Sequence, residues 1–325
     1  METKYGVISD LHEDPRIIIP ALKILKELGA DKIILNGDIG EVVKNLELTQ
    51  KHLAFILENL GKTGLECYVQ PGSHEIVPGF RPVLEHFADK YDNIFSVSSI
   101  AKREYEDHHI ILLPGSDIRS GEYQLGTGIP TDLYVNTGEA LIPYDIAEEG
   151  MKFEGFLSFQ NMCDLHDKVT DPEKTIVFCH VPRRFRNLEE AVDMAEFGEA
   201  TEDFTSQFIA GGINIEKGAI IPKGLAKDFM RAGYPVELKK KNAGNEDLRN
   251  LYDELGITKA VSGHLHESGH RANDCDGNHV EENNFVDDLF WNSGHMDAGQ
   301  TGILTVRDGK VSYHNIKFEG NKNGI

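Results

Sequence analysis

The sequence predicts an α/β fold in which a largely parallel sheet is flanked by helices. Short apolar runs rich in β-branched residues recur along the chain, and each stops at a cluster of Gly, Asp, His or Pro residues, as buried strands do. Amphipathic segments of helical period separate the first of these runs. The first third of the chain therefore has the order β-α-β-α-β, in which crossover helices join parallel strands.

Six runs are predicted to be strands, and two segments between them are predicted to be helices. The predicted strands are residues 5–8, 32–35, 66–69, 109–113, 175–179 and 258–261. Residues 15–29 place four apolar side chains on one helical face and end at Gly29, a residue suited to a helix C-terminus. Residues 41–60 repeat this helical pattern.

The C-terminus and two long central stretches follow other patterns. Residues 300–306 and 310–318 flank Asp308-Gly309, which predicts a hairpin with a type I′ turn. Residues 116–172 and 183–256 contain many Gly and Pro residues, with helical patterns only at places such as 188–197 and 246–255. We therefore expect a single domain, residues 1–325, in which these two stretches are insertions.

Composition narrows the classes of function. The chain has 325 residues, of which 40% are hydrophobic, enough for one large core. Lys and Arg total 33 against 54 Asp and Glu, and the resulting formal charge of -21 repels nucleic-acid backbones. Bound divalent cations would still make a site locally positive, so a small anionic substrate remains compatible with this charge.

Sequence features also bear on the compartment. The N-terminus has no basic region followed by an apolar stretch and a small-residue cleavage site. No run of about 18 apolar residues occurs, so we expect no membrane span. The four cysteines lie far apart, without a Cys-x-x-Cys motif. A soluble cytoplasmic protein is the expectation from these features.

Five clusters of acidic and histidine residues fall at the ends of predicted strands. They contain Asp10 with His12, Asp38 after Gly37, His74 in Gly72-Ser73-His74-Glu75, His180, and His264 with His266. Because the carboxyl ends of parallel strands face one crevice, these side chains can converge. A single Asp after a strand often caps a helix, and Gly-Asp is common in turns. Independent capping would not place all of these histidines at strand ends, so the set as a whole indicates metal binding.

The spacing and chemistry of these clusters suit transition metals. Asp10 and His12, like His264 and His266, are two residues apart, which puts both side chains of a pair on the same side of an extended segment. Imidazole nitrogens mixed with carboxylate oxygens suit Mn, Fe, Zn or Co better than Mg or Ca. Glycines at positions 37, 72 and 263 allow tight turns and close approach to a ligand.

These clusters resemble the ordered motifs of the calcineurin-like metallophosphoesterase superfamily, which are Asp-x-His, Gly-Asp, Gly-Asn-His-Asp/Glu, His and Gly-His-x-His. The resemblance covers residues 10–266. It implies a four-layer αββα sandwich of the α/β (α+β) class, with two mixed β-sheets packed face to face and flanked by helices. It also implies a site for two divalent metal ions at the strand ends.

The resemblance assigns a role to each matching residue. The implied metal ligands are Asp10, His12 and His266 for the first ion, Asp38 as the bridge, and His180 and His264 for the second. His74 would stay off the metals as the general acid. Ser73 departs from the family pattern, which has Asn as a ligand of the second metal. Because a hydroxyl is shorter and a weaker donor than an amide carbonyl, we expect a water to fill this place and the second metal to bind more weakly.

The implied activity is that of a metal-dependent phosphoric ester hydrolase, in the EC 3.1 class. Two cations roughly 3.5–4 Å apart clamp a phosphoryl group and generate a metal-bridging hydroxide, which attacks phosphorus. His74 then protonates the leaving oxygen. Glu75 either orients the His74 imidazole or is simply a first-turn carboxylate at a helix N-terminus.

Three further residues are candidates for substrate binding. Arg183 and Arg184 could clamp non-bridging phosphate oxygens, although a surface ion-pair cluster with Glu189 and Glu190 explains them equally well. His295 is the third candidate, with an ordinary loop position as the alternative.

Three functions are compatible with these residues. The preferred one is hydrolysis of a phosphomonoester or phosphodiester of a small molecule or nucleotide. The alternatives are a nuclease of the same superfamily and a binding or scaffold protein whose catalysis is weakened by Ser73. The negative charge and the lack of basic, aromatic-interleaved stretches count against the nuclease, and the presence of His74 counts against the scaffold. We therefore expect a small phosphorylated substrate as the partner, and neither nucleic acid nor a membrane.

Overall fold

A computed structural model of the chain describes residues 2–40, 45–117, 120–206 and 212–318. Its first sheet has six strands in the order β21-β20-β1-β2-β3-β4. Strands β1 to β4 run parallel, and the C-terminal hairpin adds β20 and β21 antiparallel to them. The bounds are β1 Glu2–Ile8, β2 Lys32–Asn36, β3 Glu66–Gln70, β4 Ile94–Ser96, β20 Gln300–Arg307 and β21 Lys310–Lys317.

The second sheet also has six strands, in the order β18-β19-β17-β11-β6-β5. Its four central strands are parallel, and the two edge strands pair antiparallel to them. The bounds are β18 Ala272–Asn273, β19 Leu289–Asn292, β17 Lys259–Ser262, β11 Thr175–Cys179, β6 His109–Leu113 and β5 Ala101–Glu104. All six strands predicted from the sequence are thus present, each near its expected bounds.

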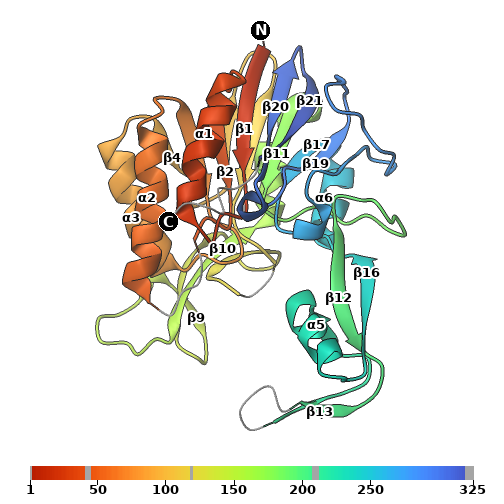
Figure 1. The fold of residues 1–325 in the computed structure, drawn as a ribbon. Helices are drawn as coiled ribbons and strands as arrows, with labels where there is room; N and C mark the ends of the chain where they lie inside the picture. Colours follow the sequence, from red (N-terminus) through yellow and green to blue (C-terminus); the bar gives the residue numbers. More distant parts are fainter. Residues whose placement is uncertain (1, 41–44, 118–119, 207–211, 319–325) are drawn as a thin grey trace.

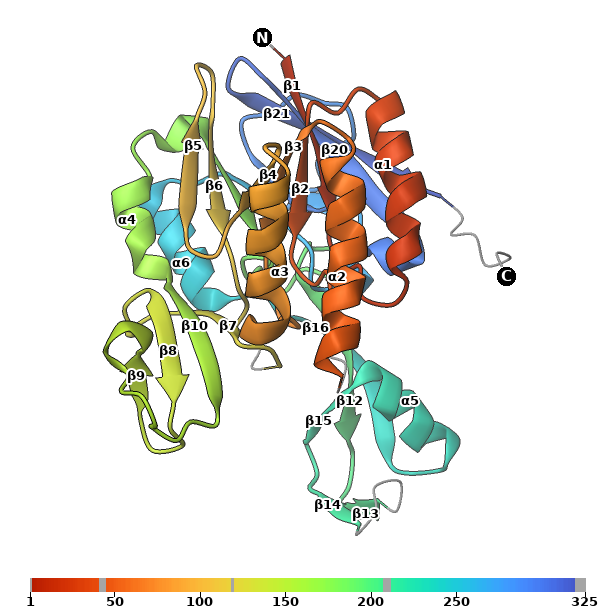
Figure 2. The ribbon, with the colours of Figure 1, turned by 90° about the vertical axis from the view of Figure 1, so that its left-hand side faces the viewer.

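The two sheets pack face to face and helices cover their outer faces (Figures 1 and 2). Buried side chains of both sheets, such as Tyr5, Phe178 and Trp291, form one apolar cluster between them. The helices α1 Ile18–Glu27, α2 Leu46–Gly61 and α3 Val77–Lys90 cover the first sheet through a second cluster, and α4 Leu165–Lys168 and α6 Glu246–Leu255 cover the other sheet through a third. The predicted four-layer sandwich is confirmed.

Local sequence explains the helix boundaries. The predicted helix 15–29 is a 3-10 turn, Pro15–Ile17, followed by α1, and its last turn gives way to Gly29 at φ 83°. Helix α2 begins at Leu46, because the Asn45 side chain accepts the backbone N–H of Leu48. The start predicted at residue 41 falls among residues outside the described ranges. Helix α6 spans the predicted residues 246–255, with Asn245 capping its start in the same way and Gly256 in the left-handed conformation at its end.

The helix predicted at residues 188–197 is wrong. The chain there makes a turn and then enters strand β12, Met194–Ala200, which pairs along its whole length with β16, Val236–Asn242. Asp193 stabilises the turn by accepting the backbone N–H groups of Phe185 and Gly244. Pairing with a strand distant in sequence therefore overrides the local helical spacing.

The first insertion forms a four-stranded sheet, and the second forms an arm (Figure 1). The sheet has the order β7-β10-β8-β9, with bounds β7 Tyr123–Gly126, β8 Asp132–Asn136, β9 Leu141–Pro143 and β10 Gly155–Asn161. The arm contains β12, β16 and the elements β13 Phe204–Ser206, β14 Ile213–Ile215, β15 Ile220–Pro222 and α5 Lys223–Arg231. Both extend from the end of the sandwich at which β1 and β2 stop (Figures 1 and 2).

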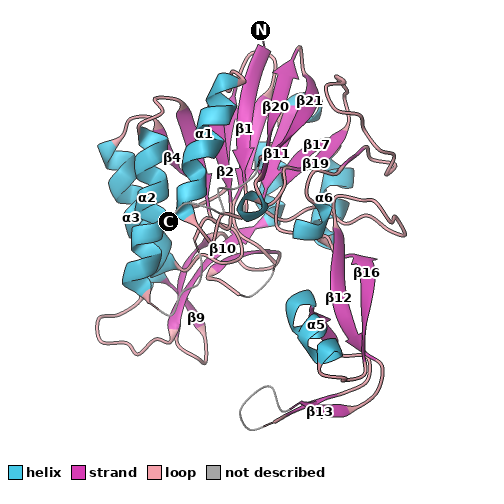
Figure 3. Ribbon diagram, viewed as in Figure 1, coloured by secondary structure: helices cyan, strands magenta, loops and turns pink. Residues whose placement is uncertain are grey.

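The remaining elements are short, and Figure 3 shows how much of the chain between strands is loop. Further 3-10 turns are Tyr144–Ile146, Met162–Asp164, Pro172–Lys174, His266–Ser268 and Met296–Ala298. The predicted C-terminal hairpin is confirmed, with Asp308 at φ 53° and Gly309 at φ 77° as a type I′ turn requires. None of the helices within the described ranges is long and apolar enough to cross a membrane.

Candidate metal centre

The six implied metal ligands come from the carboxyl ends of parallel strands of both sheets. Asp10 and His12 follow β1, and Asp38 follows β2 in the first sheet. His180 follows β11, and His264 and His266 follow β17 in the second sheet. The site therefore lies where the two sheets meet at one end, which is the convergence that the sequence predicts.

Two buried amides join the sheets directly beneath the site. Gln70 donates from Nε2 to Asn36 Oδ1 at 2.6 Å and to the Phe178 carbonyl at 3.1 Å. Asn36 donates from Nδ2 to the Cys179 carbonyl at 3.2 Å. Both amide side chains are fully buried. They fix β2 and β3 against β11, and with them the loops that carry Asp38 and His180.

Asp38, His180 and His264 form the first of two clusters whose ligand atoms lie within 4.8 Å of one another. His180 Nδ1 lies 2.8 Å from the Asn36 carbonyl, and because a carbonyl only accepts, Nδ1 carries the hydrogen. Nε2 therefore presents its lone pair to Asp38 Oδ2, 3.0 Å away. A lone pair facing a carboxylate oxygen is stable only with a proton or a cation between them.

Charges in this buried cluster shift the pKa values of its members in opposite directions. Burial opposes the charge on His180, yet Asp38 and Asp10 raise the pKa of its imidazole to about 10. Burial likewise opposes the charge on Asp38, but His180 holds the pKa of that carboxyl well below its ordinary value. Burial and the neighbouring His180 lower the pKa of His264 to about 4. The cluster thus stabilises positive charge on His180 beside the carboxylates of Asp38 and Asp10. A bound divalent cation would supply positive charge at the same place.

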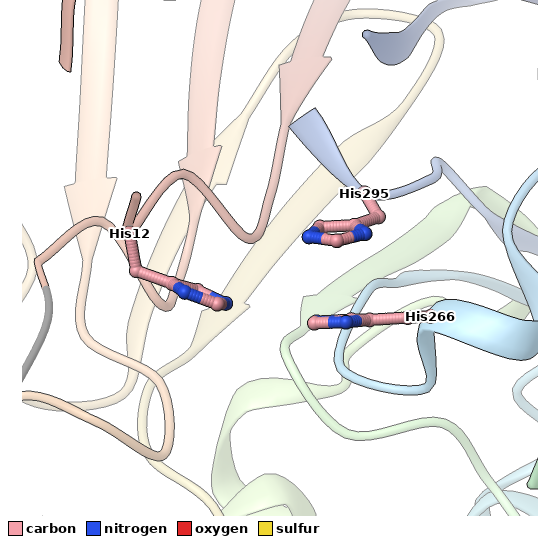
Figure 4. A group of neighbouring side chains, drawn as sticks. All are labelled: His12, His266 and His295. Atoms are coloured by element: carbon pink, nitrogen blue, oxygen red, sulfur yellow. The ribbon is translucent and has the colours of Figure 1, made fainter. Parts of the chain in front are cut away.

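His12, His266 and His295 form the second cluster, again with ligand atoms within 4.8 Å of one another. Figure 4 shows the His266 and His295 rings lying one above the other, with the His12 ring directed toward them. Asp10 adjoins this cluster, because its Oδ1 hydrogen-bonds His266 Nε2 at 3.1 Å. The structure thus brings together the three residues implied for the first metal and adds His295 to them.

Ser73 and His74 both contact the carboxylate that is proposed to bridge the metals. Ser73 donates from Oγ to Asp38 Oδ2 at 2.8 Å, and His74 donates from its backbone N–H to Asp38 Oδ1 at 2.9 Å. The His74 ring stacks on His12, and its Nε2 lies 3.9 Å from Asp38 Oδ2. At 37% exposure, its side chain is half-open to solvent, whereas the Asp38 side chain is only 2% exposed.

Glu75 has a role in the site that differs from both roles predicted for it, which were to orient the His74 imidazole and to lie in the first turn of a helix. Its buried carboxylate accepts the backbone N–H of Ile39 at 2.6 Å and that of Gly72 at 2.7 Å. These bonds join the loop after β2 to the loop after β3. The N–H at the start of α3 is instead accepted by Glu122, which bonds Val77. Burial and the charge of Asp38 raise the pKa of Glu75 to about 8, against the two backbone N–H donors.

Three residues at the site have backbone conformations that residues other than glycine rarely adopt. Asp10, Asp38 and His264 have φ values of 58°, 52° and 66°. Non-glycine residues in this region carry strain, and such residues concentrate at functional sites. Neighbouring glycines leave no room for a side chain, since a Cβ on Gly72 would lie 2.5 Å from Asp38 Oδ1. The close approach expected of Gly72 is therefore present.

Arg183 and Arg184 do not contact the six ligands through any described hydrogen bond or ion pair. Arg183 is buried, with its guanidinium over the Phe290 ring and 3.2 Å from Asp253 Oδ1. Arg184 lies 3.7 Å from Glu246 Oε2 and lines a cavity of about 540 Å³. The described ion-pair partners are thus Asp253 and Glu246 rather than the glutamates 189 and 190. Substrate binding by these arginines stays a prediction.

Asp297 is a site residue that the sequence analysis missed. Its buried carboxylate accepts the backbone N–H groups of His12 and Glu13, and its Oδ2 lies 3.4 Å from His12 Nδ1. The signal was present, because His295 and Asp297 repeat the two-residue spacing of Asp10 and His12.

The side chains present fit a pair of divalent cations. Among the described residues, Nε2 of His12, of His180 and of His295 is buried and has no hydrogen-bond partner. A buried polar atom left unpaired costs about 1–3 kcal/mol, so three of them at one place call for a ligand. The donor set of imidazole nitrogens and carboxylate oxygens matches Mn, Fe, Zn or Co.

The chain shows similarity to known proteins both in sequence and in structure. The sequence model of the calcineurin-like phosphoesterase family matches residues 3–205, more than half of the chain. The protein TT1561 of Thermus thermophilus is similar in fold, with a TM-score of 0.51 and 11% identity over 97% of this chain and 99% of that one. A dimetal phosphatase from Danio rerio gives a TM-score of 0.44 and 12% identity, covering 98% of this chain and 99% of its own. No curated protein matches the sequence.

The fold and the strand-end motifs define a metal-dependent phosphoesterase. The chain belongs to the calcineurin-like phosphoesterase family. This family depends on two metal ions, and its members hydrolyse phosphorylated substrates.

Proposed function

We propose that this protein hydrolyses a phosphomonoester or phosphodiester of a small molecule or nucleotide, with two ions of Mn, Fe, Zn or Co. The observation that carries the proposal is the position of His74. It is absent from both ligand clusters, yet it stacks on His12 and places Nε2 3.9 Å from Asp38 Oδ2. A half-exposed imidazole beside the ligands is free to exchange a proton with a bound substrate.

The ligands follow from the clusters. Asp10, His12 and His266 would hold the first ion, and His180 and His264 the second, with Asp38 between them. Bound cations would neutralise phosphate charge and lower the pKa of a water between them. Ser73 supports Asp38 by donating to Oδ2, and this bond keeps that carboxylate oxygen oriented toward His180.

The remaining contributions to the reaction come from protein side chains that are held in fixed positions. The Asp38 carboxylate is fixed by Ser73 and by the backbone N–H of His74, so it need not reorganise during the reaction. His74 would protonate the leaving oxygen as the bond between that oxygen and phosphorus breaks. Substrate enters from the solvent side, where the His74 ring is exposed.

A small substrate is preferred over nucleic acid. The net charge of -21 disfavours a long polyanion, whereas two cations are enough to attract a single phosphate group. The positively charged side chains Arg184 and Arg186 line the cavity of about 540 Å³ together with Lys240 and Lys241. We propose that Arg184, which lies 3.7 Å from Glu246 Oε2, exchanges this partner for a second anionic group of the substrate.

The decisive experiment compares His74→Ala with the wild type on two classes of substrate. Loss of a positioned proton donor slows turnover by about 10²–10⁴-fold. An alkyl phosphate needs that proton, but a nitrophenyl phosphate has a leaving group of much lower pKa and departs without it. We therefore expect a large defect on alkyl phosphates and near-normal turnover on nitrophenyl phosphate, with both metals still bound.

His279→Ala is the matched control, because His279 is an exposed histidine outside both ligand clusters. It should leave both activities at the wild-type level. Equal losses of His74→Ala on the two substrates, or loss of metal from that variant, would remove His74 from the role of general acid.

A further inference from the structure

The second ligand cluster contains a histidine that lies outside the five strand-end motifs. We propose that His295 is a further ligand of the first metal ion through Nε2, and that Asp297 positions His12, the ligand beside it. This inference rests on the proposed function, because it assigns a residue to one of the two metal sites of that function.

Geometry is the first argument. The His295 and His266 rings stack with centroids 3.6 Å apart and an angle of 13° between their planes. The His12 ring is nearly parallel to His295, with centroids 5.9 Å apart. Figure 4 shows His295 lying over His266, with the His12 ring directed toward this pair. A nitrogen of each ring lies within 4.8 Å of a nitrogen of the others, close enough to share one cation.

The unpaired state of His295 is the second argument. Its side chain is 18% exposed, and its Nε2 is buried without a hydrogen-bond partner among the described residues. His270 serves as a comparison, because it is a histidine with a structural role: its Nε2 forms a hydrogen bond with the Thr301 carbonyl at 3.0 Å. A buried imidazole that makes no such bond is available to a metal.

Asp297 supplies the third argument. Its side chain is 2% exposed, and its Oδ2 lies 3.4 Å from His12 Nδ1 and 3.7 Å from His295 Nε2. Metal-bound histidines commonly have a carboxylate beside the ring nitrogen that faces away from the metal, which fixes the ring and raises its basicity. Asp297 holds this position beside His12 Nδ1, and His12 Nε2 is left for the metal. The backbone N–H groups of His12 and Glu13 hold this carboxylate in place.

The loop that carries His295 is fixed against the first ligand loop. The backbone N–H of Met296 donates to the Ser9 carbonyl at 3.0 Å, and that of Asp297 donates to the Asp10 carbonyl at 3.3 Å. The His295 backbone N–H donates to Gln300 Oε1. The loop that carries the imidazole is thus held at its position before any ligand arrives, as a metal site requires.

The two metal sites become unequal as a result. The first has three imidazoles, from His12, His266 and His295, whereas the second has two imidazoles and Ser73 in place of an amide ligand. More nitrogen ligands favour Zn, Co or Fe over Mn. The first equivalent of Zn²⁺ should therefore enter the first site.

The test is a titration of the metal-free full-length protein with Zn²⁺, followed by X-ray absorption at one equivalent. We expect three imidazoles around zinc in the wild type and two in His295→Ala. The affinity for the first equivalent should fall by at least the roughly 10–100-fold that loss of an outer carboxylate partner costs. Asp297→Asn should weaken it by about 10–100-fold while keeping three imidazoles, and His279→Ala should match the wild type.

Unchanged affinity and an unchanged imidazole count in His295→Ala would overturn the inference, with the proposed function intact. A raised KM with unchanged zinc affinity would also overturn it, because His295 would then contact substrate rather than metal. If the wild type bound no divalent metal, the proposed function itself would fail. Urea unfolding of each metal-free variant shows whether an altered zinc affinity comes from an altered fold. If His295→Ala lost affinity only because it was unfolded, and Asp297→Asn bound zinc normally, the result would count against the inference.

Discussion

Asn36 and Gln70 join the two sheets beneath the metal centre, and their contribution to stability can be measured with a double-mutant cycle. Asn36→Ala removes the bond to the Cys179 carbonyl and the 2.6 Å bond from Gln70. Gln70→Ala removes that same shared bond and the one to the Phe178 carbonyl. Each variant leaves a buried partner unpaired, which costs about 1–3 kcal/mol, and also opens a small cavity. We expect each to lower the free energy of unfolding by about 2–4 kcal/mol.

The shared bond sets the size of the coupling. Each single variant loses this bond and leaves the amide of its partner unpaired. Adding the two losses in free energy of unfolding therefore counts the shared bond twice and includes two unpaired amides that the double variant does not have. The double variant should therefore cost about 1–2 kcal/mol less than the sum of the singles. Urea unfolding of the metal-free protein, monitored by circular dichroism, measures all four corners of the cycle.

Asn59→Ala serves as the control, because Asn59 is a partly exposed amide whose Nδ2 donates to a carbonyl of its own helix. It should change the free energy of unfolding by less than about 0.5 kcal/mol. Effects of Asn36→Ala and Gln70→Ala that simply add, within about 0.3–0.5 kcal/mol, would show that the two amides act independently. The view of this pair as the link between the sheets would then be wrong.

Three further predictions concern the metal centre. Asp38→Ala should abolish metal-dependent hydrolysis, and a variant that kept both metals and full turnover would place the bridge elsewhere. Ser73→Asn should lower the metal concentration needed for half-maximal activity; a higher requirement would mean that the Ser73 bond to Asp38 matters more than an amide ligand. Gly72→Ala should weaken metal binding, because its Cβ would lie 2.5 Å from Asp38 Oδ1, whereas Gly224→Ala, with open space around it, should bind metal as the wild type does in the same titration.

Sequence predicted well those features that local pattern determines. The strands end at Gly, Asp and His clusters, so both the strand positions and the convergence of Asp10, Asp38, His180 and His264 could be inferred from the chain alone. Helix α3 was not predicted, because Pro78 and Pro82 disguise it. Pro78 lies in the first turn, where its missing N–H costs nothing.

Features that depend on distant contacts escaped prediction. The spacing of apolar residues around Met194 is compatible with a helix, and only pairing with β16 makes it a strand. Nothing in the sequence marks Asn36 and Gln70 as partners, because a buried amide has no characteristic spacing. The role of Glu75 likewise depends on the backbone of Ile39, which folding alone brings within reach.

The arm between β12 and β16 leaves the sandwich and returns to it where these two strands meet, and Lys223 in α5 also pairs with Glu267 of the sandwich at 3.1 Å. Met194, at its start, pairs directly with Asn242, at its end. Its side chains form an apolar cluster of their own, around Phe229 and Val236. None of the proposed metal ligands lies between these two ends, so changes within the arm would not remove a ligand. Relatives could lengthen, shorten or exchange the arm, and so change which molecules reach the metal centre, without disturbing the groups that carry out the hydrolysis.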